Sequence, residues 1–201
     1  MPDLTITLPD GSPRTLPEGA TGADLAADIG PGLAKAAVIV SVDGEGRDLG
    51  RPLADGDAVS VVTADSDEGL HTLRHSTAHV LAQAVLDLWP GATHAIGPPI
   101  EDGFYYDFEL PDGASFTADD LGAIDTRMRE IIDADQPFER FEAGATEALE
   151  LFADHRYKRE IIEKVTTGGA DPEMAGEAST DGSVTWYRNG EGFVDLCTGP
   201  H

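Results

Sequence analysis

The chain is short of cysteines, long apolar runs and basic residues, and each shortage excludes a class of protein. Its 201 residues include one cysteine, Cys197, so an intramolecular disulfide is excluded. The thiol is left as a packed group, a metal ligand or a reactive group. Residues 1–10 show no basic segment followed by an apolar run, and no run of about 18 apolar residues occurs anywhere. We therefore expect a cytoplasmic protein without a membrane partner.

Basic residues are outnumbered by acidic ones, 13 to 38, and the formal net charge is −25. Such a surface repels phosphates, so composition argues against DNA or RNA as a partner. One local feature opposes this, because positive charge gathers within ten residues at His155, Arg156, Lys158, Arg159 and Lys164. A second interpretation is that the acidity is an adaptation to high salt, where charges are screened. Stability that falls steadily as salt rises would count against that hypothesis.

Residues 1–63 are predicted to form a small first domain. Residues 4–8 alternate apolar and polar side chains, and Pro9 to Ser12 provide a turn before a return strand at 14–16. The segments that follow are a helix at 23–29 with Thr21 as its N-cap, ended at 30–32, and strands at 37–42 and 58–62. This order resembles a β-grasp fold, and Leu-Pro-Asp-Gly at 8–11 with Leu-Ala-Asp-Gly-Asp at 53–57 resembles the TGS domain. We expect a folding or docking module rather than a direct RNA or nucleotide contact.

A polar linker at 63–69 leads to a larger α+β domain at 70–201. A helix at 70–89 carries an apolar face of Leu73, Val80, Leu81, Ala84, Val85 and Leu88. The rest is predicted as a β-hairpin within 97–110, a helix from the N-cap Thr117 to 134, a strand at 138–141, helices at 145–152 and 157–165, a long flexible insertion at 166–183, and strands at 184–188 and 193–196.

Two pairs of residues carry candidate chemistry. His75 and His79 are one helical turn apart, so both imidazoles can point at one atom. Cys197 and His201 follow the last predicted strand within one turn of irregular chain. Two such pairs supply the donors of a tetrahedral zinc site, or of a hydrolytic pocket that uses the same groups without a metal.

Three motifs together resemble the editing domain shared by threonyl- and alanyl-tRNA synthetases. They are His75-Ser76-Thr77-Ala78-His79-Val80-Leu81-Ala82-Gln83-Ala84, Gly103-Phe104-Tyr105-Tyr106-Asp107 and Asp195-Leu196-Cys197-Thr198-Gly199-Pro200-His201. Preceded by a TGS-like segment, they resemble the N-terminal region of the bacterial-type threonyl-tRNA synthetases. The resemblance implies an editing domain of the second-additional-domain type. It also implies catalytic roles for His75, His79, Lys158, Cys197 and His201, with Tyr106 and Asp195 lining the substrate site.

The implied activity is removal of serine from the acceptor end of mischarged tRNA(Thr), with rejection of threonine. Serine and threonine differ by one methyl group, worth roughly 1–3 kcal/mol of discrimination, so a synthetic site needs a second, correcting site. His75 or Lys158 would position or deprotonate the attacking water. We favour a metal-free pocket; if zinc is bound, His75, His79, Cys197 and His201 are the expected ligands. The remainder of a synthetase chain is the expected second partner, since no aminoacylation core is recognisable and the chain is expected to be a fragment.

Two features depart from the family pattern: Thr198 stands where an arginine is expected, and the segment 168–182 is longer than expected. Two alternatives stay open, a free-standing alanyl-type editing deacylase and a non-catalytic RNA-binding or regulatory module with a structural zinc. His71, His94 and His155 are expected to be ordinary surface or core histidines, and Tyr105 and Trp89 to be packing residues.

Overall fold

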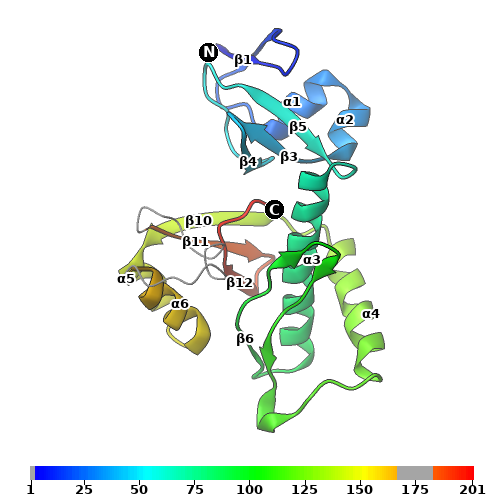
Figure 1. Cartoon of the computed structure of the whole chain (residues 1–201), viewed down its shortest axis with the longest axis vertical. Coiled ribbons are helices and arrows are strands. Elements are labelled where there is room, and N and C mark those ends of the chain that lie inside the picture. The colour runs from blue at the N-terminus through cyan, green and yellow to red at the C-terminus, as the bar shows by residue number, and fades with distance from the viewer. Residues whose placement is uncertain (1–2, 167–182) are drawn as a thin grey trace. The chain divides into compact units, whose positions relative to one another are not determined.

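The computed structural model describes residues 3–166 and 183–201, which form two compact units (Figure 1). The first unit comprises Met1–Arg74 with Pro200–His201, and the second comprises His75–Gly199. Most of the insertion predicted at 166–183 lies outside the described residues. None of the helices in the described part of the chain is long and apolar enough to span a lipid bilayer.

The first unit begins with the predicted hairpin, in which β1 (Asp3–Thr7) pairs antiparallel with β2 (Pro13–Pro17). The order β4–β3–β5 forms a three-stranded sheet from β3 (Ala37–Val42), β4 (Glu45–Asp48) and β5 (Val59–Thr63). A parallel bridge from Thr7 to Ala58 joins the hairpin to this sheet. The core beneath is aliphatic, and its buried side chains are Leu4, Ile6, Leu16, Ala20, Leu25, Val40, Val42, Leu53 and Val59. The strand order matches the predicted β-grasp arrangement.

The helix of the first unit starts where the sequence predicts. Thr21 caps α1 (Gly22–Ile29) through a capping box: its hydroxyl accepts from the Asp24 backbone N–H, and the Asp24 carboxylate accepts from the Thr21 backbone N–H. The predicted stop at residues 30–32 instead opens a second helix, α2 (Pro31–Ala36), which the sequence analysis missed. Proline at the first helical position explains this, because its fixed φ suits a helix start.

Helix α3 (Asp67–Leu88) starts in the first unit and continues through the second, beginning three residues earlier than predicted. In the second unit Val80, Ala84 and Val85 are buried against α4 (Asp120–Asp133), which runs beside α3 (Figure 1). Leu73 and Leu88, predicted on the same apolar face, are 40% and 37% exposed. The prediction of Thr117 as the N-cap of α4 is wrong. Asp119 is the cap, and Thr117 instead donates its hydroxyl to Asp120.

A three-stranded antiparallel sheet supports the end of the chain. Its central strand β11 (Ser183–Asn189) pairs with β10 (Phe138–Gly144) on one side and with β12 (Phe193–Leu196) on the other. The helices α5 (Ala145–Leu151) and α6 (Arg156–Thr166) belong to the same core, in which Phe152, Ile161, Ile162, Val184 and Leu196 are buried. The packing of α6 on this sheet carries one face of the helix into the interior of the unit.

The hairpin predicted between residues 97 and 110 is present, and a second short antiparallel pair accompanies it. The hairpin is β7 (Pro99–Ile100) with β8 (Gly103–Phe104), and the second pair is β6 (Thr93–His94) with β9 (Phe108–Glu109). Between β8 and β9, Tyr106 turns inward and Tyr105 turns outward. Tyr105 is 42% exposed, so its prediction as a core residue is wrong.

Candidate functional site

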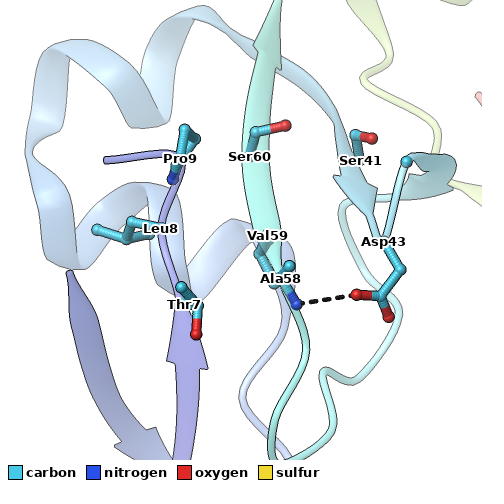
Figure 2. A pocket seen from close by; sticks show the side chains of 9 residues that line it. Thr7, Leu8, Pro9, Ser41, Asp43, Ala58, Val59 and Ser60 are labelled. Atoms are coloured by element: carbon cyan, nitrogen blue, oxygen red, sulfur yellow. Dashed lines mark hydrogen bonds between the residues drawn. The ribbon is translucent and has the colours of Figure 1, made fainter. Parts of the chain in front are cut away.

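The first unit has a surface cavity without catalytic chemistry. It measures about 290 Å³ and is lined by the end of β1, by β3 and by β5 (Figure 2). Asp43 is the one titratable residue in its lining, and its carboxylate turns back to accept a hydrogen bond from the Ala58 backbone N–H at 3.2 Å. A nucleophile paired with a base, which hydrolysis requires, is therefore not found among these lining residues.

In the second unit, three predicted residues converge from two elements. His75 and His79 lie on α3 with ring centroids 5.1 Å apart, as expected for i and i+4 positions. Cys197 follows β12, and its Sγ lies 3.1 Å from Nε2 of His75. The donor atoms of these three side chains all lie within 4.8 Å of one another. Nitrogen and thiolate donors at this spacing fit a zinc ion, and equally a thiol–imidazole pair without metal.

The backbone around Cys197 is fixed by Thr185 on β11. The Cys197 N–H donates to the Thr185 carbonyl at 3.1 Å, and the Thr185 hydroxyl donates to the Cys197 carbonyl at 2.7 Å. The Gly199 N–H donates to Sγ of Cys197 at 3.2 Å. Gly199 has φ +73°, and a Cβ there would lie 2.0 Å from the Tyr187 hydroxyl, so only glycine fits this turn.

Beside this cluster, Asp195 is the centre of a buried polar group. Its Oδ1 lies 2.7 Å from Nζ of Lys158 and 3.2 Å from Nε2 of His94. Its Oδ2 accepts a hydrogen bond from the Tyr106 hydroxyl. Nε2 of His79 is 3.9 Å from Oδ2, so Asp195 stands next to the histidine–cysteine cluster. Lys158 is 0% exposed and Asp195 is 1% exposed, so the ion pair is sealed from water.

Burial and charge set the protonation of these groups. Burial lowers the pKa of His79 to about 3, against the opposing charge of Asp195, so this imidazole is neutral near pH 7. Burial alone would raise the pKa of Asp195, but Lys158 and then His94 hold it well below its usual value. The second unit therefore places a neutral imidazole next to a buried carboxylate that is ionised near pH 7 and contacts the Lys158 amine.

A glycine determines where Tyr106 sits. A Cβ on Gly97 would lie 2.1 Å from the Tyr106 ring, so the ring packs directly on the glycine backbone. The ring also stacks on Phe108 at a centroid distance of 5.2 Å. These contacts aim the Tyr106 hydroxyl at Asp195.

The predicted residues fall into two sets. His75, His79 and Cys197 form one cluster, and Tyr106, Lys158 and Asp195 form the other. His201 lies in the first unit, where its backbone N–H donates to Asp48 at 2.8 Å, and its membership of the cluster stays a prediction.

Burial adds to what the sequence indicated for two residues. Lys158 belongs to the basic residues gathered between 155 and 164, but it is buried and does not add to a basic surface there. His94 is a core histidine, one of the two expected places, and its Nε2 bonds the central carboxylate. No local spacing marks His94, because its partner is 101 residues away.

Comparison with known proteins supports the predicted resemblance. Residues 4–63 match the family model of the TGS domain. The chain is 51% identical over 201 residues to the threonine–tRNA ligase of Maricaulis maris, which covers 98% of this chain and 29% of that protein. It is 47% identical over 203 residues to that of Citrifermentans bemidjiense and 48% identical to that of Geobacter sp. strain M21, with 100% of this chain and 29% of each relative covered. The chain thus spans less than a third of the length of these curated relatives.

Proposed function

We propose that this chain corresponds to the N-terminal part of a threonine–tRNA ligase, and that it hydrolyses the ester of serine wrongly attached to tRNA(Thr) while sparing the threonyl ester. The observation that carries the proposal is the His75–Cys197 contact of 3.1 Å beside a buried, charged Asp195–Lys158 pair. In this proposal the second unit is the editing domain. Its partners are the acceptor end of the tRNA and the remainder of a synthetase chain.

His75 is the group that best fits the role of proton carrier. Lys158 is held by Asp195 at 2.7 Å, which favours its charged form and makes it a poor base. In a neutral thiol–imidazole pair, the Cys197 S–H donates to Nε2 of His75, and the thiol sulfur accepts from the Gly199 N–H. Nε2 of His75 therefore carries the lone pair of the ring, and water replaces the thiol as its hydrogen-bond donor before passing it a proton.

The reaction follows from this assignment. Water attacks the carbonyl carbon of the aminoacyl ester and passes a proton to Nε2 of His75. The tetrahedral intermediate collapses, the bond between the carbonyl carbon and the ribose oxygen breaks, and that oxygen takes the proton from His75. The products are free serine and tRNA with its terminal hydroxyl restored. In this proposal discrimination comes from space, because a pocket beside His75, His79 and Cys197 has to admit serine and exclude the threonine methyl group.

A metal-free pocket is the form we propose, with zinc as the alternative. His75, His79 and Cys197 would be zinc ligands, since their donors are of the type zinc prefers and lie within 4.8 Å of one another. A bound zinc would supply Lewis acidity and lower the pKa of a coordinated water. The roles of Lys158, Asp195 and Tyr106 are the same in both forms, because these residues hold one another rather than a ligand.

The test is deacylation of Ser-tRNA(Thr) and Thr-tRNA(Thr) by this chain, by His75→Ala and by the control His71→Ala, with and without a chelator. His71 lies one turn earlier on α3 and is exposed. We expect loss of serine only, a fall of about 100-fold or more in His75→Ala, and an unchanged rate in His71→Ala. Loss of activity with chelator would select the zinc form. If neither ester is hydrolysed while the tRNA binds, the chain is a binding module and the proposal is wrong.

A further inference from the structure

His94 is the one member of the buried polar group that the proposed function leaves without a role. It ends β6, where it pairs with Phe108 on β9, and its side chain is 2% exposed. Nε2 lies 3.2 Å from Oδ1 of Asp195. The rings of Tyr106, Phe193 and His155 surround it at centroid distances of 5.7, 5.9 and 6.0 Å. The imidazole therefore sits in an aromatic enclosure with one polar contact to the carboxylate.

The two ring nitrogens of His94 have different surroundings. A carboxylate can only accept, so Nε2 must carry a hydrogen. Nδ1 is buried, and residues 3–166 and 183–201 offer it no hydrogen-bond partner. The hydrogen bond from Nε2–H to Asp195 is therefore the one polar contact that holds the ring.

The hydrogen bond from His94 restrains the carboxylate that the other residues share. Oδ1 of Asp195 faces both Lys158 and His94, and Oδ2 faces Tyr106. With donors on both oxygens from three separate elements, rotation of the carboxylate breaks at least one bond. Loss of the His94 donor leaves Lys158 alone on Oδ1, and a flexible ammonium can follow a rotating carboxylate where a packed imidazole cannot.

We propose that His94 is a positioning residue for the ester hydrolysis, and that its Nε2–H holds Asp195 in the orientation that orders Lys158 and Tyr106 beside the His75–Cys197 pair. This inference rests on the proposed function for its kinetic consequence, and on the described contacts for its structural one. The competing explanation is that the His94 ring only fills space. Variants that move or remove the hydrogen-bond donor distinguish this explanation from the proposed positioning role.

Three substitutions distinguish the donor from the ring. His94→Gln places an amide N–H near the position of Nε2, His94→Asn places one near Nδ1, and His94→Leu fills the volume without a donor. We expect kcat for Ser-tRNA(Thr) to fall about 10- to 100-fold in the Asn and Leu variants, the usual effect of losing a hydrogen bond to a charged group. The Gln variant should stay within about threefold of wild type, and KM should change less than about twofold in all three.

A second measurement tests the restraint without relying on catalysis. The rate at which an acylating reagent modifies Lys158, followed by peptide mass spectrometry on the whole chain, should rise in the Asn and Leu variants and not in the Gln variant. Imidazole ¹⁵N shifts of wild-type protein should show a hydrogen on Nε2 of His94. If wild-type chain does not hydrolyse Ser-tRNA(Thr), the proposed function fails, while labelling and shifts still decide whether His94 restrains Asp195.

The inference is overturned by either of two results. One is a Gln variant that loses as much activity, or as much protection of Lys158, as the Leu variant. The other is a Leu variant that keeps both wild-type activity and wild-type protection of Lys158. If Leu alone fails to fold, the Asn and Gln variants provide the same comparison, because each keeps a polar side chain at the site.

Discussion

The two units bury different kinds of side chain. The first unit has no aromatic residue anywhere in residues 1–74, and its core is aliphatic. The second unit contains every phenylalanine, tyrosine and tryptophan of the chain, and it buries His79, Gln83, His94, Lys158, Thr185, Asn189 and Asp195. Buried polar groups cost free energy unless they are paired, so their concentration marks where stability has been given up for chemistry. The first unit buries only two polar side chains among its described residues, Asp48 and Thr72.

The largest effect is expected from breaking the central ion pair. Asp195→Asn leaves the fully buried Lys158 without a counter-charge and should lower the free energy of unfolding of the second unit by about 3–5 kcal/mol. Urea unfolding followed by tryptophan fluorescence measures this unit specifically, because both tryptophans lie in it.

The double variant Lys158→Met/Asp195→Leu is the control for charge. It should regain most of the stability that Asp195→Asn loses, since replacing both partners by apolar groups removes the unpaired charge. It should not regain deacylation. Recovery of activity together with stability would mean that the pair is structural only.

Removing aliphatic volume from the first unit should lower the stability of the first unit instead of the second. Ile6 is fully buried, and Ile6→Ala should cost about 2–5 kcal/mol through lost burial and the cavity left behind. Hydrogen exchange of the β3 amides reports on this unit, which fluorescence does not see. A protection of β3 equal to wild type would contradict the assignment of Ile6 to the core of the first unit.

A smaller effect is expected from substitution of Gly97, because the Tyr106 ring of the buried polar group packs on it. Gly97→Ala puts a Cβ 2.1 Å from the Tyr106 ring and should cost about 1–3 kcal/mol by overpacking, with loss of deacylation. Gly122→Ala is the matched control, because a Cβ at this helical position meets nothing within 4 Å. The control should be stabilised by up to about 1 kcal/mol and keep its activity. Equal activity in the two variants would contradict the placement of Tyr106 on Gly97.

The smallest effects compare two Thr-x-x-Asp segments, one in each unit. Thr21→Ala removes a true N-cap and should cost about 1 kcal/mol, whereas Thr117→Ala removes a hydroxyl that caps nothing and should cost under about 0.5 kcal/mol. Thermal unfolding followed by circular dichroism measures both. A loss of stability in Thr117→Ala as large as that in Thr21→Ala would contradict the conclusion that only Thr21 is an N-cap.

The Thr21 effect should also depend on pH. The Thr21 backbone N–H, and then its hydroxyl, lower the pKa of Asp24 below the usual range. Because the folded-state pKa lies below the unfolded one, the stabilisation is complete above the ordinary aspartate pKa of about 3.9 and is lost as pH falls through the folded value. The difference between wild type and Thr21→Ala should therefore shrink below about pH 4.

Local patterns predicted the elements well where one rule decided the outcome. The alternation at residues 4–8 and the cap at Thr21 depend on neighbouring residues alone, and both were confirmed. Thr117 shows the limit of such rules: its hydroxyl bonds the Asp120 side chain, and the helix starts without it. Pro31 shows a second limit. A proline in this position can follow the end of one helix or start the next, and the neighbouring residues do not show which of these it does.

The site was predicted in part for the same reason. His75 and His79 share a helix, and Cys197 and His201 share one motif, so spacing alone was sufficient to predict each pair. Joining the two pairs rested on their donor types, because His75 and Cys197 are 122 residues apart. The roles of Lys158 and His94 depend on contacts with Asp195 that cross 37 and 101 residues of chain, as the residue numbers give (195 − 158 and 195 − 94). Such contacts exist only once α6, β6 and β12 have packed, and no local rule contains them.

The hydrogen bonds between Thr185 and Cys197 suggest how such a site changes during evolution. They hold the backbone of residue 197 from both its N–H and its carbonyl, and the sulfur holds the loop through the bond it accepts from the Gly199 N–H. The side chain at this position can therefore be exchanged for another hydrogen-bond acceptor while the loop keeps its course. Descendants of one ancestral scaffold would then diverge in reaction chemistry through a single codon, without first having to rebuild the fold that presents it.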